Sequence, residues 1–91
     1  MEVRALIAWN MKRLRVGRAL SQERLAADSG VDRAYVSEIE RELVAVSVDV
    51  LDRLAATLGV PVAMLLTEPS DRTAPPSNLP KGRKPASERD R

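Results

Sequence analysis

The segment GVDRAYVSEIER, residues 30–41, decides what the chain can fold into. Gly30 can adopt the positive φ angle that a sharp turn needs. Asp32 belongs to the residue types that commonly cap the N-terminus of a helix. Apolar residues then recur at helical spacing among charged ones. The pattern predicts a short helix over residues 33–41 that begins directly after a tight turn.

A second short helix is predicted just before this turn. Ser21 is an N-cap candidate for the segment QERLAADS, whose helix would end at Gly30. A complete capping box is missing, because Arg24 stands where Glu or Gln would reach back. Two short helices across a glycine turn, in a chain with no strand signal, indicate a helix-turn-helix motif.

The flanking sequence predicts three further helices, over residues 3–17, 48–58 and 61–67. Ser47 is a capping residue for the second of these, and Pro61 suits the first turn of the third. We therefore expect an all-α five-helix bundle over residues 1–68. Its core should include Val31, Val36, Ile39, Leu25, Ala26 and Leu54.

The amino-acid composition excludes several classes of function. The chain has 91 residues, no Cys and no His, which excludes disulfides, Cys/His zinc sites and catalysis by either residue, so neither a metal nor a cofactor is expected. No apolar run is long enough to span a bilayer, and a cytoplasmic protein without membrane contact is the expectation. Asp49 and Asp52 are spaced as on an exposed helix face, without a phosphate-binding glycine loop, so an enzyme is not expected.

Residues 69–91 differ sharply from the rest of the chain. They hold five of the six prolines and six Lys or Arg against three Asp or Glu, whereas residues 1–68 carry nine against ten. This composition predicts a disordered basic tail that attracts DNA electrostatically. Its segment PKGRKP, residues 80–85, loosely resembles an AT-hook, and insertion into a minor groove is the alternative role.

Three stretches, LSQERLA, SGVDRAYVSEIER and LDRLAATLGVP, occur in the order and at the spacing of one family. Over about residues 4–67 the chain resembles the Xre/Cro-repressor type of helix-turn-helix domain. The resemblance implies a lambda-repressor-like fold and a transcriptional regulator that binds double-stranded operator DNA as a homodimer. The helix over residues 33–41 would then lie in the major groove.

Three residues of that helix are candidates for contacts with bases. Arg33 can donate two hydrogen bonds to guanine, and Ala34 can meet a thymine methyl group. Glu38, one turn later on the same side, can accept a hydrogen bond from cytosine N4. The alternative for this surface is a solvated helix face that touches phosphates only.

Other residues are candidates for contacts with the DNA backbone. Gln22 stands in the first turn of its helix, where free N–H groups favour a phosphate, and the resemblance implies that it contacts one. Tyr35 could reach a phosphate with its hydroxyl or pack its ring against the helix before the turn. The remaining candidates are Ser37, Arg13 and Arg41.

The resemblance also implies a structural ion pair between Glu40 and Arg15, which would join the first helix to the recognition helix. The alternative is two separate surface charges. The segment ELVAVS, residues 42–47, departs from the family, which commonly has Gly, a basic residue, Asn and Pro there. Because Glu42 replaces the glycine that would end the helix in a left-handed turn, we expect a different geometry at this helix end.

Leu43, Val44 and Val46 form an apolar cluster in this surface loop. They either pack locally against the helix over residues 48–58 or form a dimer contact, since exposed apolar patches mark interfaces. The loss of polar groups here supports an alternative function. The chain would then be a protein-interaction module, or an antitoxin-like partner of another protein, with the fold kept and DNA binding weakened.

Overall fold

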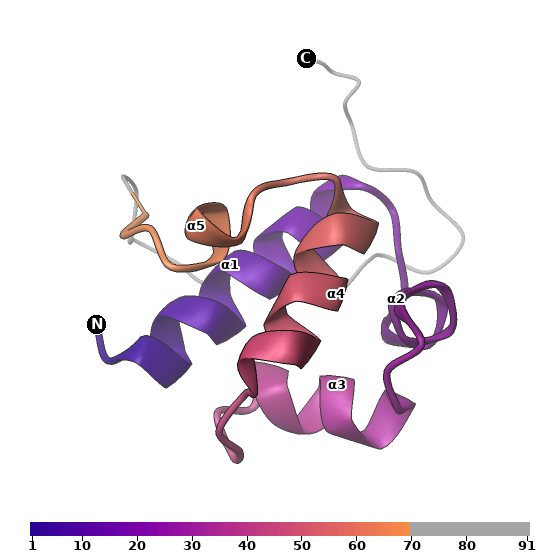
Figure 1. The fold of residues 1–91 in the computed structure, drawn as a ribbon, viewed down its shortest axis with the longest axis horizontal. Coiled ribbons are helices and arrows are strands. Elements are labelled where there is room, and N and C mark those ends of the chain that lie inside the picture. The colour runs from indigo at the N-terminus through magenta and orange to yellow at the C-terminus, as the bar shows by residue number, and fades with distance from the viewer. Residues whose placement is uncertain (70–91) are drawn as a thin grey trace.

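The computed structural model describes residues 1–69, and this part of the chain folds into five helices without a strand. The predicted all-α architecture is therefore confirmed. Figure 1 shows α3 at the lower end of the bundle and α2 to its upper right, while α4 stands in the centre in front of α1. Beyond Pro69, the predicted basic tail lies outside the described residues. The helices are α1 (Val3–Gly17), α2 (Gln22–Ser29), α3 (Arg33–Glu40), α4 (Val48–Leu58) and α5 (Val62–Leu65).

Three helices begin with the side-chain caps that the sequence predicts. Each cap oxygen accepts a hydrogen bond from a backbone N–H of the first turn, which would otherwise lack a partner. The pairs are Ser21 with Arg24 at 2.9 Å, Asp32 with Ala34 at 3.0 Å, and Ser47 with Val50 at 3.1 Å. The first of these forms without the reciprocal half of a capping box.

A residue with a positive φ angle lies one or two positions after the end of each of the first four helices. In each case the N–H of the next residue donates a hydrogen bond to a carbonyl of the last helical turn. That carbonyl would otherwise have no partner within the helix. Glycine tolerates this geometry because it has no Cβ atom. The four residues and their φ angles are Ala19 at 56°, Gly30 at 76°, Glu42 at 63° and Gly59 at 72°.

The expectation of a different geometry at Glu42 is wrong. The N–H of Glu42 bonds to the carbonyl of Ile39 at 3.0 Å, and the N–H of Leu43 bonds to the carbonyl of Glu38 at 2.9 Å. These are the two hydrogen bonds of a Schellman motif. Because they close the end of α3, the chain keeps the left-handed turn even though a side chain replaces the usual glycine.

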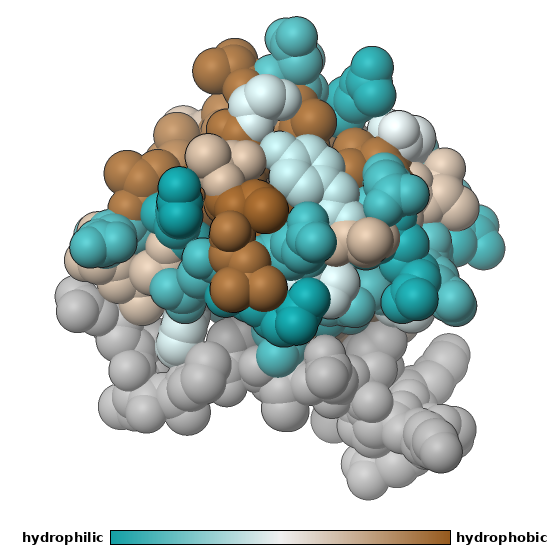
Figure 2. Space-filling view, turned by 90° about the horizontal axis from the view of Figure 1, so that it is seen from below, coloured by the Kyte–Doolittle hydropathy of each residue, from teal (hydrophilic) through white to brown (hydrophobic). Residues whose placement is uncertain are grey.

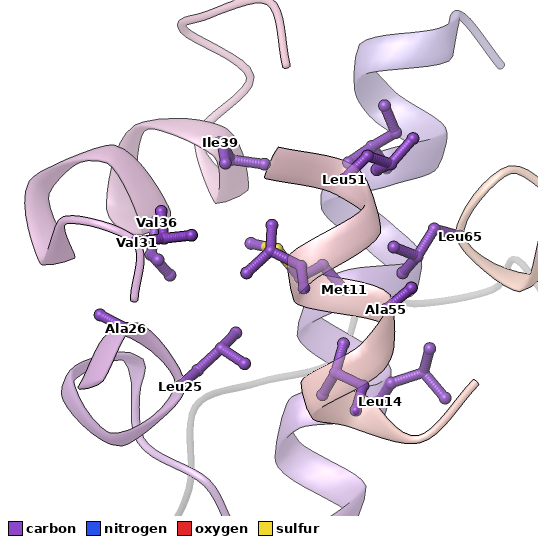
Figure 3. Packing of buried hydrophobic residues seen from close by; sticks show 13 residues of the cluster. Met11, Leu14, Leu25, Ala26, Val31, Val36, Ile39, Leu51, Ala55 and Leu65 are labelled. Carbon is purple, nitrogen blue, oxygen red and sulfur yellow. The ribbon is translucent and has the colours of Figure 1, made fainter. Parts of the chain in front are cut away.

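The core lies where all five helices meet (Figure 3). Met11, Leu25 and Val36 have no exposed surface, and they come from α1, α2 and α3. Burial of each such side chain stabilises the fold by about 1.5–3 kcal/mol. The predicted core is confirmed, since each of its members is at most 6% exposed: Val31, Val36, Ile39, Leu25, Ala26 and Leu54.

A buried polar residue fixes the last helix against the first. Asn10 of α1 is 1% exposed, and its Nδ2 donates to the carbonyls of Leu65 at 3.1 Å and Thr67 at 2.8 Å. The helix predicted over residues 61–67 is shorter and ends at Leu65, after which the N–H of Leu66 bonds to the carbonyl of Ala63, three residues back, at 3.0 Å. Pro61 precedes this helix instead of standing in its first turn. Among the described residues, no helix is long and apolar enough to cross a membrane.

Candidate nucleic-acid interface

The outer side of α3 is the candidate interface. Figure 2 looks onto the end of the molecule where α3 lies, and hydrophilic side chains cover most of the surface there. The inner side of the helix is formed by Val36 and Ile39, which are at most 1% exposed. The outer side carries the predicted contacts: Arg33, Ala34 and Arg41 are exposed, while Ser37 and Glu38 are half-buried.

Arg33 stands at the first position of α3, and its side chain is largely exposed to solvent. Its side chain is 60% exposed, and its Nε lies 3.9 Å from Oε2 of Glu23, which is 77% exposed. An exposed pair of this kind contributes less than about 1 kcal/mol. Sequence reasoning missed Glu23, because it lies ten positions before Arg33, on the other side of a turn, and no helical spacing links the two residues. Only the packing of α2 against α3 reveals this contact.

The structure brings Arg15 and Glu40 together in a buried ion pair. Arg15 Nε donates to Glu40 Oε2 at 2.8 Å, and Arg15 Nη2 donates to Glu40 Oε1 at 3.0 Å. The two side chains are 2% and 3% exposed. This two-fold contact ties α1 to the last residue of α3, so it holds the recognition helix on the core.

Gln22 also belongs to this buried cluster. Its Nε2 donates to Glu40 Oε1 at 3.0 Å, so its amide points into the protein and not toward solvent. Sequence reasoning placed the Gln22 side chain on the DNA backbone. Glu40 lies eighteen positions further along the chain, and the sequence gave no signal of this bond. The backbone N–H groups of the first turn of α2 are a separate feature, and they can still meet a phosphate.

Tyr35 makes a contact that sequence reasoning did not predict. Its hydroxyl donates to the carbonyl of Ala45 at 2.9 Å, and its ring packs against the core cluster. A tyrosine has one hydroxyl hydrogen, so a hydrogen bond from Tyr35 to a phosphate requires that the bond to Ala45 breaks. Tyr35 therefore links α3 to the loop over residues 41–47.

That loop divides into a packed part and an exposed part. Val44 and Val46 are half-buried against the core, which agrees with local packing. Leu43 is 58% exposed, and Val48 at the start of α4 is 79% exposed. Figure 2 shows that hydrophobic side chains also lie on this face, among the hydrophilic ones. Of the predicted apolar cluster only Leu43 is exposed, and Val48, which the prediction did not include, is a second exposed apolar side chain near it in sequence.

The charge of the motif is acidic for a DNA-binding surface. Residues 21–42 contain three arginines and six carboxylates, one of which is neutralised by Arg15. Arg41 follows α3, and Arg13 lies on α1; both are exposed. Among the described residues, no group of acidic side chains is arranged to hold a metal ion.

Comparison with known proteins agrees with this geometry. Residues 11–65 match the helix-turn-helix family. A hypothetical transcription factor of Neisseria meningitidis is 41% identical over 71 residues, which are 78% of this chain and 67% of that protein. The crystal structure of the hypothetical transcription factor NHTF from Neisseria superposes with a TM-score of 0.73 at 41% identity, over 75% of this chain and 78% of the other.

Two restriction-modification controller proteins have similar structures. C.AhdI from Aeromonas hydrophila superposes with a TM-score of 0.66 at 35% identity, over 68% of this chain and 94% of the other. C.Esp1396I, as a tetramer in complex with its natural 35 base-pair operator, gives a TM-score of 0.66 at 26% identity, over 71% of this chain and 86% of the other.

The fold and the exposed side of α3 define a class of protein, the DNA-binding transcriptional regulators with a helix-turn-helix. Within that class, the chain belongs to the Xre/lambda-repressor-like helix-turn-helix family. The family and the relatives described above are regulators of transcription and not enzymes.

Proposed function

We propose that the chain binds a palindromic operator as a homodimer, with α3 of each copy in a major groove. The single observation that carries this proposal is the exposed first turn of α3, where Arg33 and Ala34 stand free of the core. Side chains at this end of a recognition helix reach base edges. A related controller protein bound to its operator as a tetramer supports the proposal by analogy.

Within this arrangement each outer residue has its own role. Arg33 donates to guanine, Ala34 meets a thymine methyl group, and Glu38 accepts from cytosine N4. The backbone contacts are assigned to the first-turn N–H groups of α2, to Ser37, and to the arginines Arg13 and Arg41. In a dimer, the half-sites lie about 34–36 Å apart, which is one turn of the DNA helix.

The test is selection of bound duplexes from a random pool, with the unaltered chain and Arg33→Ala compared at moderate salt. We expect an inverted repeat for the unaltered chain and a loss of preference at one base pair per half-site for the variant. One bidentate contact discriminates by about 1–3 kcal/mol. If neither protein enriches any sequence and binding is only salt-labile, the proposal is rejected. Sedimentation of the complex tests the stoichiometry of two chains per site.

A second function is supported by different observations. The excess of carboxylates in the motif opposes phosphate, and the exposed pair of Leu43 and Val48 offers an apolar contact. In this reading the chain is an antitoxin-like partner of another protein. It predicts weak DNA binding that does not depend on Arg33, and binding of the partner that is lost in Leu43→Ser with Val48→Ser.

The same apolar pair is our candidate for the dimer contact. If Leu43 and Val48 are covered by a second copy, replacing both by Ser lowers dimer formation and operator affinity together. Both functions agree with a cytoplasmic location, and localisation of a tagged chain tests it.

A further inference from the structure

We propose that Gln22 is a positioning residue for DNA binding, which acts through the carboxylate of Glu40 and not by contact of its own side chain with DNA. This inference rests on the proposed operator binding. Its basis is a hydrogen bond in which Gln22 Nε2 donates to Glu40 Oε1 at 3.0 Å. The same oxygen also accepts a hydrogen bond from Arg15 Nη2 at 3.0 Å.

The three side chains join three helices at one point. Arg15 comes from α1, Gln22 is the first residue of α2, and Glu40 is the last residue of α3. A further bond from Arg15 Nη1 to the carbonyl of Leu20, at 2.8 Å, holds the chain just before α2 begins. The ion pair is at most 3% exposed, so water competes little with these bonds.

The location of this cluster gives it a role in orienting the motif. At their other junction, α2 and α3 are joined by the left-handed turn at Gly30. A turn at one junction and the bond between Gln22 and Glu40 at the other fix the angle between the two helices. Binding needs that angle, because α2 must present its first N–H groups to a phosphate while Arg33 of α3 faces the bases.

The substitution Gln22→Glu tests this geometry, because it places a second carboxylate against Glu40. The charged groups at this point are Arg15 from α1 and Glu40 from α3. Lys12 of α1 and Glu42, just after α3, line the same pocket as Glu40. On α2 itself, Glu23 and Arg24 are exposed. On α4, Arg53 lies at the carbonyl of Gly30, at the other end of α2, and both aspartates of α4 are exposed.

Two carboxyl groups in contact favour the protonated form of the introduced one, which raises its pKa above the ordinary value of about 4.3. The sign follows from linkage. A group whose pKa is raised by folding contributes its full stability below the unfolded pKa and loses it as the pH rises through the folded pKa. The thermal midpoint of free Gln22→Glu should therefore lie nearest that of the unaltered chain below about pH 4.3 and fall relative to it as the pH rises, with a larger gap at pH 8 than at pH 5.

Operator affinity should follow the same course. Relative to the unaltered chain at each pH, Gln22→Glu should bind nearly normally at pH 5 and at least about tenfold more weakly at pH 8. A side chain that touched a phosphate directly would behave differently. Its carboxylate would repel the phosphate at both pH values, and the stability of the free protein would not change with pH beyond that of the unaltered chain.

A matched double variant, Gln22→Glu with Glu40→Gln, keeps one amide and one carboxylate at the cluster. We expect it to lose the pH dependence that Gln22→Glu introduces. Gln22→Ala, measured well below its melting temperature, should bind the operator about tenfold more weakly while its base preferences stay unchanged.

Each result decides the question. A pH-dependent stability gap together with the pH-dependent affinity loss supports the positioning role. A stability gap without any loss of affinity overturns it, because the bond would then serve the fold alone. A loss of affinity at both pH values without a stability gap also overturns it, in favour of direct contact. If the unaltered chain selects no sequence, the proposed function fails, and the stability gap of the free protein still reports whether the bond exists.

Discussion

The two arginine–glutamate pairs around α3 have opposite characters. The pair of Arg15 and Glu40 joins two helices through contacts of 2.8 and 3.0 Å, and its side chains are almost fully buried. The pair of Arg33 and Glu23 spans 3.9 Å, and both side chains are more than half exposed. An arginine and a glutamate therefore form a structural link on the inner side of α3. On its outer side, the same two residue types form a weak contact that can break easily.

The difference shows how one short helix can pack against the core on its inner side and keep its outer side chains exposed. A buried pair loses its hydration on folding, so it must stay intact once it has formed. An exposed pair is screened by water and salt, so Arg33 can leave Glu23 at little cost. The inner contacts thus keep the orientation of α3 constant, while the outer side chains remain available for DNA.

The largest expected effect comes from breaking the inner pair. Glu40→Ala leaves the guanidinium of Arg15 buried without its carboxylate, which costs about 3–5 kcal/mol. A domain of this size is stable by only about 5–10 kcal/mol, so much of its stability would be lost. Thermal unfolding followed by circular dichroism measures this change.

A double replacement provides the control for that result. Arg15→Met combined with Glu40→Leu removes both charges together and should restore most of the stability, as for other buried pairs replaced by apolar residues. If Glu40→Ala unfolds at the same temperature as the unaltered chain, the buried pair has no stabilising role.

Sequence reasoning predicted the fold because its signals are local. The caps at Ser21, Asp32 and Ser47 and the turn at Gly30 depend on residues a few positions apart, and the structure has all four. Apolar spacing also selected the correct core. These features follow from backbone chemistry that any sequence of this pattern shares.

Contacts across the fold were harder to predict. The amide of Gln22 meets Glu40, and the hydroxyl of Tyr35 meets Ala45, because packing brings distant segments together. Asn10 was missed for the same reason, since its role depends on where α5 ends. At Glu42 the residue type suggested one geometry, but hydrogen bonds at the end of α3 imposed another.

The end of α3 provides the next prediction, with the end of α2 as its matched control. Glu42 holds a φ angle of 63°, where a residue with a Cβ atom is strained by about 1 kcal/mol. Glu42→Gly should therefore stabilise the fold by about 1 kcal/mol, which raises the melting temperature by about 4–8 °C. Gly30→Ala should shift it in the opposite direction by a similar amount, because a Cβ atom there meets no neighbour within 4 Å and only the backbone strain acts.

These paired substitutions separate backbone strain from charge. Glu42→Gln removes the charge and keeps the Cβ atom, so its stability should stay within about 0.5 kcal/mol of the unaltered chain. If Glu42→Gly and Glu42→Gln have equal effects, charge and not backbone geometry governs this position.

A smaller effect is expected where Tyr35 links α3 to the following loop. Tyr35→Phe removes the hydrogen bond to Ala45 but keeps the ring against the core, so stability should fall by about 0.5–1 kcal/mol. Amide exchange should show faster opening of residues 43–46 in the variant. Unchanged exchange in that loop would mean that packing of Val44 and Val46 alone holds it.

The smallest effect on stability is expected at the outer pair. Glu23→Gln removes a weak exposed contact, so the free energy of unfolding should change by less than about 0.5 kcal/mol. Operator affinity should nevertheless rise about two- to threefold at low salt, because Arg33 loses a competing carboxylate and the approaching phosphates lose a repelling one. This gain in affinity should fade as the salt concentration increases. If Glu23 acts by competing for Arg33, Glu23→Gln should give no gain when it is introduced into Arg33→Ala. A gain of equal size in the presence and absence of Arg33 would assign the effect to phosphate repulsion, and the outer pair would then have no part in reading DNA.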